Sequence, residues 1–130
     1  MPRSSSRNPT ELELEILKVL WRLGPATVRQ VRDELAAVRD LAYTTVMTMM
    51  TIMDTKGYVK RVKDGRSFIY EATYQEQKAS RNMLKDVVDR LFGGSTKAVM
   101  QHLLETSELD DEELNQIRQI INRKAGEKSE

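Results

Sequence analysis

The chain has 130 residues, of which 39% are hydrophobic and 32% charged, a size suited to one compact domain or to a small domain with a helical extension. Cysteine is absent, which excludes disulfides, thiolate metal ligands and a cysteine nucleophile. The net charge is only +1, but residues 1–72 hold 12 Lys/Arg against 9 Asp/Glu and residues 73–130 hold 9 against 11, which favours the first half as the partner of a polyanion.

No apolar run reaches the roughly 18 residues that a membrane-spanning helix requires. The first residues are polar and basic, and they lack the apolar stretch of a signal peptide. We therefore expect no membrane association and a cytoplasmic location. We also expect residues 1–8 to be disordered.

Two helices are predicted next, each begun by a capping box, in which a threonine and a Glu or Gln three residues later satisfy free backbone N–H groups. The pairs Thr10/Glu13 and Thr27/Gln30 have this spacing, and Gly24-Pro25 separates the two helices. The predicted apolar stripes are Leu12, Ile16, Leu17, Leu20 and Trp21 in the first helix and Val28, Val31, Leu35 and Val38 in the second.

A third helix is predicted over residues 42–57, and threonines crowd its polar side. Threonine is an unusual choice for a solvated helix face, because its β-branched side chain loses freedom there. Its hydroxyl and methyl suit phosphate oxygens, base edges and the thymine methyl, although the threonines could also be neutral surface residues. The expected inner face is Val46, Met49, Met50 and Met53, and the polar face is Tyr43, Thr44, Thr45, Thr48 and Thr51.

After Gly57 the hydrophobic period changes from helical to alternating. Two alternating segments, residues 58–63 and 66–72, flank Asp64-Gly65, which is the pattern of a β-hairpin. Candidates for packing onto the helices are Val59, Val62, Phe68 and Tyr70, and the basic residues are Lys56, Lys60, Arg61, Lys63 and Arg66. Such cations can also protect a solvated strand edge.

Three helices followed by a basic hairpin form a winged helix-turn-helix, in which the third helix enters the major groove of DNA. We predict a mainly α fold, with this DNA-binding domain in residues 1–72, and double-stranded DNA as the partner. The predicted contacts are Tyr43, Thr44, Thr45 and Thr48 to base edges and phosphates and Lys60, Arg61, Lys63 and Arg66 to the backbone, with Arg3 and Arg7 of the N-terminal arm as further candidates.

Residues 73–130 predict three more helices, the first begun by a capping box at Thr73 and ended by Gly93-Gly94. Their apolar faces are too wide for three helices to bury, which favours a homodimer built by residues 74–124 over an intramolecular bundle. The predicted dimerisation residues are Leu84, Val88, Leu91, Val99, Leu103, Leu114, Ile117 and Ile121.

These features together resemble the family of penicillinase, methicillin-resistance and copper-responsive repressors (BlaI/MecI/CopY). The matching segments are ELEILKVLW at residues 13–21, TVRQV at 27–31, LAYTTVMT at 41–48, KG at 56–57 and GRSFIY at 65–70. The resemblance implies a dimeric winged-helix repressor whose third helix docks on a palindromic operator in a bacterial cytoplasm, associated with the nucleoid. It also implies a partner that relieves repression, a sensor protease or another inducer.

Three departures from the family pattern concern the inducing signal and the contacts. Copper-responsive members carry a cysteine-rich metal motif, which this chain lacks. In β-lactam-responsive members a membrane sensor protease cuts an Asn-Phe bond in the fifth helix, where this chain reads Gln101-His102, so induction by that cleavage is not predicted. Ile52 replaces a common arginine, which removes one backbone contact.

Enzymatic chemistry is not predicted. The single histidine, His102, lies beside Leu103 and is expected in a core or an interface, and no Ser/His/Asp set, glycine-rich phosphate loop or calcium loop can be assembled. The methionines of residues 47–53 follow the core period, which favours packing over metal binding. We expect no cofactor and no metal. The alternative to a repressor is a winged-helix adaptor that binds proteins and not DNA.

Overall fold

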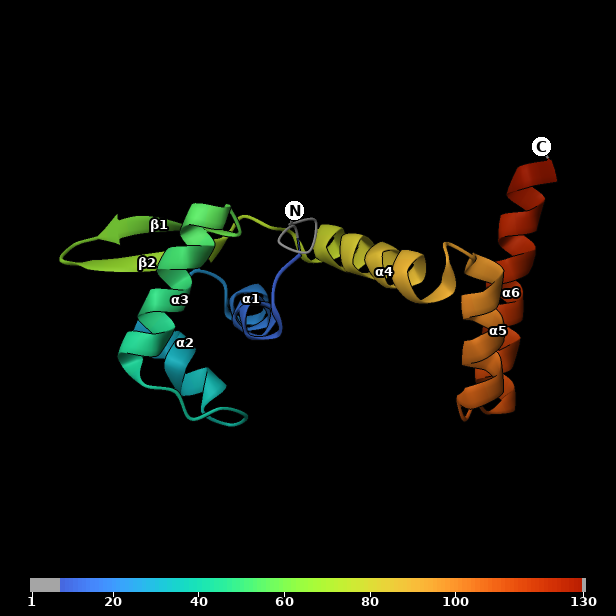
Figure 1. Ribbon diagram of the computed structural model, residues 1–130, viewed down its shortest axis with the longest axis horizontal. Coiled ribbons are helices and arrows are strands. Elements are labelled where there is room, and N and C mark those ends of the chain that lie inside the picture. Colours follow the sequence, from blue (N-terminus) through green and yellow to red (C-terminus); the bar gives the residue numbers. More distant parts are fainter. Residues whose placement is uncertain (1–7, 130) are drawn as a thin grey trace. The chain divides into compact units, whose positions relative to one another are not determined.

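A computed structural model describes residues 8–129 of the chain. Within them the chain forms α1 (Glu11–Leu23), α2 (Val28–Leu35), α3 (Tyr43–Lys56), β1 (Val59–Asp64), β2 (Ser67–Ala72), α4 (Glu76–Phe92), α5 (Thr96–Thr106) and α6 (Asp111–Ser129) (Figure 1). This order confirms the predicted mainly helical, winged-helix fold. The N-terminal arm with Arg3 and Arg7 lies outside the described residues.

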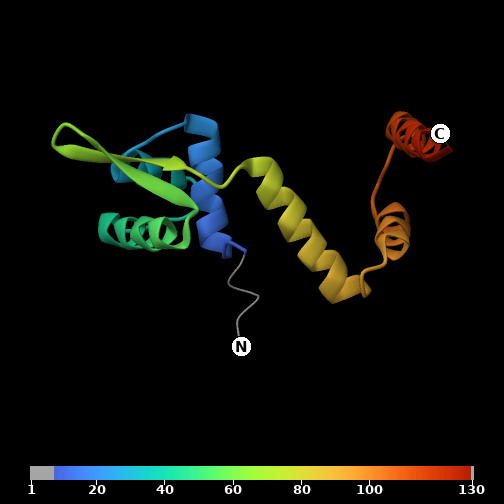
Figure 2. The ribbon, with the colours of Figure 1, turned by 90° about the horizontal axis from the view of Figure 1, so that it is seen from above.

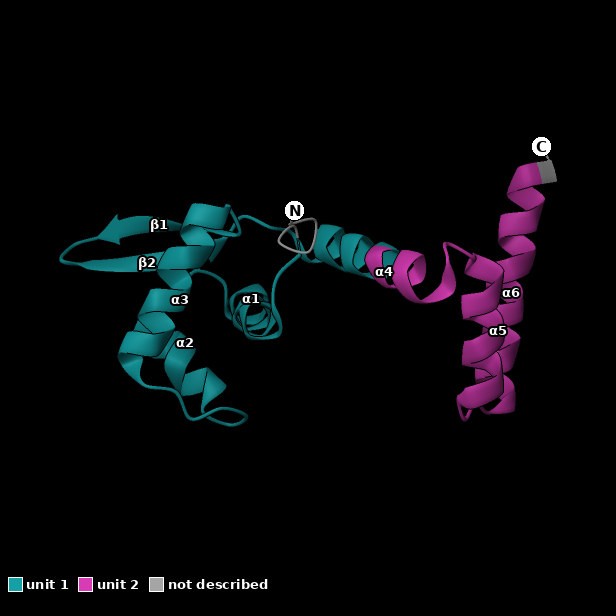
Figure 3. Ribbon diagram, viewed as in Figure 1, with its two compact units in different colours: residues 1–85 teal, residues 86–130 magenta. Residues whose placement is uncertain are grey.

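The chain divides into two compact units, Met1–Lys85 and Asp86–Glu130 (Figure 3). The division falls inside α4, so the first half of α4 belongs to the unit that holds the three N-terminal helices and the hairpin. The functional boundary expected after residue 72 stays a prediction. Across residues 8–129, every helix is too short or too polar to cross a bilayer.

Both predicted capping boxes at the N-terminus are confirmed. The hydroxyl of Thr10 accepts from the N–H of Glu13 at 3.2 Å, and that of Thr27 accepts from the N–H of Gln30 at 3.1 Å. The second helix is shorter than expected, because it ends at Leu35. Val38 therefore lies beyond the helix and is 72% exposed, so its prediction as a core residue is wrong.

One hydrophobic core joins α1, α2, α3 and the hairpin, which pack around it (Figure 2). The loop before α2 also bonds to the hairpin, since Ala26 and Tyr70 exchange two backbone hydrogen bonds of 3.0 and 2.8 Å. This bridge fixes the root of the hairpin against the helices. The fully buried side chains of the core include Ile16, Leu17, Val31, Leu35, Val46, Met50, Met53 and Val59.

The hairpin confirms the prediction of two strands, with the turn displaced by one residue. Asp64 pairs with Ser67, so the turn residues are Gly65 and Arg66, and the positive φ of 63° falls on Gly65, where an L side chain would be strained. Directly opposed residues share a face of a hairpin, so the register defines two faces. The inner face holds Val59, Arg61, Lys63, Phe68, Tyr70 and Ala72, and the outer face holds Lys60, Val62, Asp64, Ser67, Ile69 and Glu71.

The four hairpin residues that were predicted to pack onto the helices therefore have different outcomes. Val59 and Tyr70 lie on the inner face and are buried, as expected. Val62 lies on the outer face and is half-buried. Phe68 is 41% exposed although it lies on the inner face, so its expected packing onto the helices is wrong.

Tyr74 anchors the start of α4 to the first unit. Its carbonyl accepts from the indole N–H of Trp21 at 2.9 Å, and its ring stacks on Tyr58 with 5.2 Å between centroids. The predicted capping role of Thr73 is wrong: the Thr73 hydroxyl donates to the carbonyl of Gly57 at 2.7 Å, and α4 begins only at Glu76.

The carboxylate of Glu13 joins the first turn of α1 to the last turn of α3. Glu13 is 1% exposed, its Oε1 accepts from the N–H of Thr10 at 2.8 Å, and its Oε2 lies 2.8 Å from Nζ of Lys56. Burial raises the pKa of the neighbouring Tyr58, and the charge of Glu13 adds to that rise. Lys56 therefore belongs to a partly buried ion pair and not to the basic surface of the hairpin.

We predict that Lys56→Met lowers the free energy of unfolding by about 1–3 kcal/mol, because it leaves the buried Glu13 carboxylate without its cation. Lys60→Met is the matched control, since its pair with Glu71 is largely exposed and contributes less than about 1 kcal/mol. Urea unfolding followed by the fluorescence of Trp21, the one tryptophan of the chain, measures both. Equal losses for the two variants would contradict the importance of the buried pair.

Candidate nucleic-acid interface

The packing of α3 decides which of its side chains face outward. Val46, Met50 and Met53 are completely buried, so the side of the helix opposite to them faces away from the core. The predicted contact residues are all exposed: Tyr43, Thr44, Thr45 and Thr48. Thr51, Ile52 and Thr55 extend the same exposed surface toward the C-terminal end of the helix.

The hydroxyls of this surface are of two kinds. Thr51 and Thr55 donate to the carbonyls of Met47 and Thr51, at 2.9 and 3.3 Å, inside the helix. Among the described residues, the hydroxyls of Thr44, Thr45 and Thr48 have no such bond. These three side chains therefore retain their donors and acceptors for a partner.

The prediction that the methionines of α3 all belong to the core is wrong for Met47. It is 41% exposed, whereas Met50 and Met53 are completely buried. Met47 follows Tyr43 by one helical turn and precedes Thr51 by another, so the three side chains form a stripe along α3.

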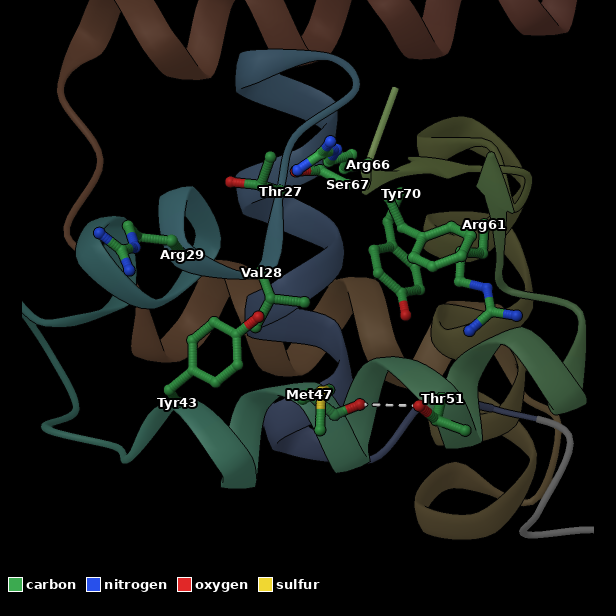
Figure 4. A pocket seen from close by; sticks show the side chains of 11 residues that line it. Thr27, Val28, Arg29, Tyr43, Met47, Thr51, Arg61, Arg66, Ser67 and Tyr70 are labelled. Carbon is green, nitrogen blue, oxygen red and sulfur yellow. Dashed lines mark hydrogen bonds between the residues drawn. The ribbon is translucent and has the colours of Figure 1, made fainter. Parts of the chain in front are cut away.

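A cleft of about 710 Å³ borders this stripe (Figure 4). It lies between α3, the start of α2 and the hairpin, and its surface is both basic and partly apolar. Its main lining residues are Arg29 of α2, Tyr43, Met47 and Thr51 of α3, and Arg61, Arg66, Phe68 and Tyr70 of the hairpin region.

The structure separates the four cations predicted on the hairpin. Arg61 and Arg66 line the cleft, and Lys63 is exposed on the same inner face as Arg61. Lys60 points to the outer face, where its Nζ lies 3.2 Å from Glu71. Three of the four cations therefore lie on or beside the surface that α3 presents, and Lys60 does not.

Arg29 was not singled out from the sequence, where it belongs to an ordinary outward-facing helix surface. The structure places it at the exposed start of α2, on the border of the cleft. The sequence did contain a signal for Arg29. A cation in the first turn of the first helix of a helix-turn-helix lies near the groove that the third helix enters. Within the described residues, Arg29, Arg61, Lys63 and Arg66 pair with no carboxylate.

Residues 8–129 contain no cluster of three potential metal ligands from His, Asp and Glu. His102 is exposed, so the core position expected for it is wrong, and the interface position stays a prediction. Its ring lies 5.8 Å from that of Phe92 in a tilted arrangement.

The cleft beside α3 contains cations, hydroxyls and apolar side chains, which suit an anionic partner with apolar parts.

The residues predicted to form a dimer lie in α4, α5 and α6, with Leu84 at the end of the first unit and the other seven in the second unit. None of the eight is buried in the described chain: Leu84, Leu91, Leu103, Leu114 and Ile121 are between 37% and 75% exposed, and Val88, Val99 and Ile117 are half-buried. A cleft of about 320 Å³ between α5 and α6 is lined almost wholly by apolar side chains, among them Leu103, Leu104, Ile117, Ile120 and Ile121.

Comparison with known proteins places this architecture in a family. The sequence profile of the penicillinase repressors matches residues 9–123. The chain belongs to the penicillinase repressor family. Membership confirms the resemblance seen in the sequence, and the family consists of repressors and not of enzymes.

Individual relatives are similar over most of their length. The transcriptional regulator BlaI of Mycobacterium tuberculosis is 34% identical over 78% of this chain and 75% of its own. The penicillinase repressor of Bacillus licheniformis is 26% identical over 93% of this chain and 94% of its own.

Solved structures are also similar to this chain, and the first of the two below supports the fold. A MarR family protein from Bacillus stearothermophilus aligns with a TM-score of 0.50 and 18% identity over 93% of this chain and 76% of its own. The DNA-binding domain of the repressor BlaI aligns with a TM-score of 0.48 and 29% identity over 53% of this chain and 84% of that domain.

We predict that Thr48→Ala leaves the free energy of unfolding unchanged or raises it by up to about 0.5 kcal/mol, because the hydroxyl has no partner in the fold and alanine is the better helix former. Met50→Ala, two residues along the same helix, should lower it by about 2–5 kcal/mol by opening a cavity in the core. Urea unfolding compares the two. A substantial loss for Thr48→Ala would show that the threonine face is structural.

Proposed function

We propose that the protein is a DNA-binding transcriptional repressor that acts as a homodimer on a palindromic operator. The observation that carries the proposal is the orientation of α3, which exposes the free hydroxyls of Thr44, Thr45 and Thr48 on the same helix that borders a basic cleft. Membership of the penicillinase repressor family supports it independently.

In this proposal α3 enters the major groove. Tyr43, Thr44, Thr45 and Thr48 contact base edges and phosphates, since short hydroxyls and a threonine methyl match the groups exposed there. Arg61, Lys63 and Arg66 hold the adjacent backbone, whose charge they neutralise. Lys60 lies on the outer face of the hairpin. It contacts the DNA backbone only from that face, and its pair with Glu71 must open first.

The homodimer is proposed from the apolar surface of the second unit. Leucine and isoleucine side chains at the end of α4 and along α5 and α6 are exposed in the single chain, and a second copy would remove them from water. Two winged helices held together in this way would read two half-sites separated by one helical turn of DNA or a multiple of it.

Relief of repression requires a further partner, a sensor protease or another inducer. The Gln101-His102 bond lies in the middle of α5, and both side chains are exposed. This bond stands where β-lactam-responsive members have an Asn-Phe bond, and α5 would have to open locally before a protease could cut it, so we do not propose cleavage here as the inducing step.

DNA recognition is tested with a duplex selected by the protein from a random pool and a scrambled duplex of the same composition. We expect Thr45→Ala to lose affinity for the selected duplex alone, by about 1–3 kcal/mol, because it contacts a base edge. Lys63→Ala should weaken binding to both duplexes and reduce the slope of log K against log salt by about one. Fluorescence anisotropy at several salt concentrations measures both effects.

Equal affinity of the unchanged protein for the selected and the scrambled duplex would contradict sequence-specific recognition. Failure to bind either duplex at low salt would favour the alternative, a winged-helix adaptor that binds proteins, because an adaptor lacks the steep salt dependence of a DNA-binding surface.

Dimerisation is tested by Leu103→Asp, which places a charge in the apolar cleft between α5 and α6. We expect a dissociation constant at least tenfold higher, because the charge must be desolvated in the interface. Gln116→Asp is the matched control, since it makes the same change in charge at an exposed polar position of α6. Sedimentation equilibrium distinguishes the dimer from the 15.0 kDa chain, and an unchanged protein that sediments as a monomer would contradict the proposal.

A further inference from the structure

Phe68 is an aromatic residue that the core does not use. It lies on the inner face of the hairpin, the face that also carries the buried Tyr70, yet it is 41% exposed. Its directly opposed partner is Lys63. Burial in the core therefore does not explain a phenylalanine at this position.

The contact of Phe68 with Arg61 does explain it. The register pairs Arg61 with Tyr70 and Lys63 with Phe68, so Arg61 and Phe68 are diagonal neighbours on one face. The guanidinium carbon of Arg61 lies 4.2 Å from the centroid of the Phe68 ring, within the range of a cation–π contact. In residues 8–129 no carboxylate pairs with Arg61, and the ring of Phe68 is the group that contacts its guanidinium.

Both residues line the cleft between the hairpin and α3. Figure 4 labels Arg61 there. The ring meets the guanidinium at its central carbon, and the N–H groups of arginine point outward from that carbon in the plane of the guanidinium. Arg61 can therefore keep its contact with the ring while it donates hydrogen bonds to a phosphate.

We propose that Phe68 is a positioning residue for DNA binding: its ring holds the Arg61 guanidinium in place at the cleft before DNA arrives. The proposal rests on the proposed function, since the phosphate that Arg61 meets belongs to the operator. A free arginine side chain loses rotamer freedom when it binds, and a side chain already held by a ring loses less.

The test is a double-mutant cycle on the selected duplex with Phe68→Leu, Arg61→Gln and the double variant. We expect Phe68→Leu to weaken binding about two- to five-fold, the effect of one exposed cation–π contact. In the Arg61→Gln background the same change should have no further effect, because the residue that the ring positions is gone. Phe68→Tyr keeps a ring and should restore the affinity of the unchanged protein.

Two measurements separate positioning from a loss of folding. Thermal unfolding shows whether each variant is folded, and Ile69→Val on the outer face is the matched hairpin control, with unchanged affinity expected. In the DNA-free protein, proton NMR should show the side-chain signals of Arg61 shifted upfield by the ring, and Phe68→Leu should abolish that shift.

An equal loss from Phe68→Leu with and without Arg61 would overturn the proposal, because the ring would then contact DNA by itself. An unchanged affinity in Phe68→Leu, or the absence of an upfield shift in the DNA-free protein, would overturn it as well. Failure of the unchanged protein to bind any duplex would refute the proposed function, and that outcome is visible before any variant is made.

Discussion

The burial of Val46, Met50 and Met53 in the core is the constraint on which the exposed surface of α3 depends. Three side chains on one face of a helix fix its rotation about its axis, so the threonines on the other face are exposed as a consequence. The ion pair between Glu13 and Lys56 adds a second fixed point, because it ties the last turn of α3 to the first turn of α1. A surface that reads DNA requires this rigidity, because its contacts tolerate a misplacement of only fractions of an ångström.

Helix starts and the polar face of α3 could be predicted from the sequence, because they follow from local rules. A capping box needs only two residues at a fixed spacing, as Thr10 and Glu13 show, and a helical period assigns Val46 and Thr48 to opposite faces. Thr73 had the same spacing as Thr10, but a tertiary contact decided its role, since its hydroxyl bonds to Gly57. Local spacing therefore predicts a cap only where no distant group competes for the hydroxyl.

The faces of the hairpin could not be predicted with the same security, because a shift of one residue exchanges them. Asp64-Gly65 indicated a turn, but the turn that forms is Gly65-Arg66, and in the hairpin that results Arg61 lies on the inner face with Tyr70 and Lys60 on the outer face with Glu71. Met47 was misassigned for a related reason: hydrophobicity favoured the core, whereas its angular position places it beside the cleft. Both corrections concern the candidate interface, where a sequence can depart from the rule that apolar residues are buried.

The most direct test of this account is an NMR titration of the isotope-labelled protein with its selected duplex, in which every backbone amide is a probe. We expect the large shifts to cluster in residues 43–51 of α3 and in the inner face of the hairpin around Arg61 and Phe68. Shifts confined to the apolar surface of α5 and α6, or spread without pattern over the whole chain, would contradict the claim that the exposed face of α3 reads DNA.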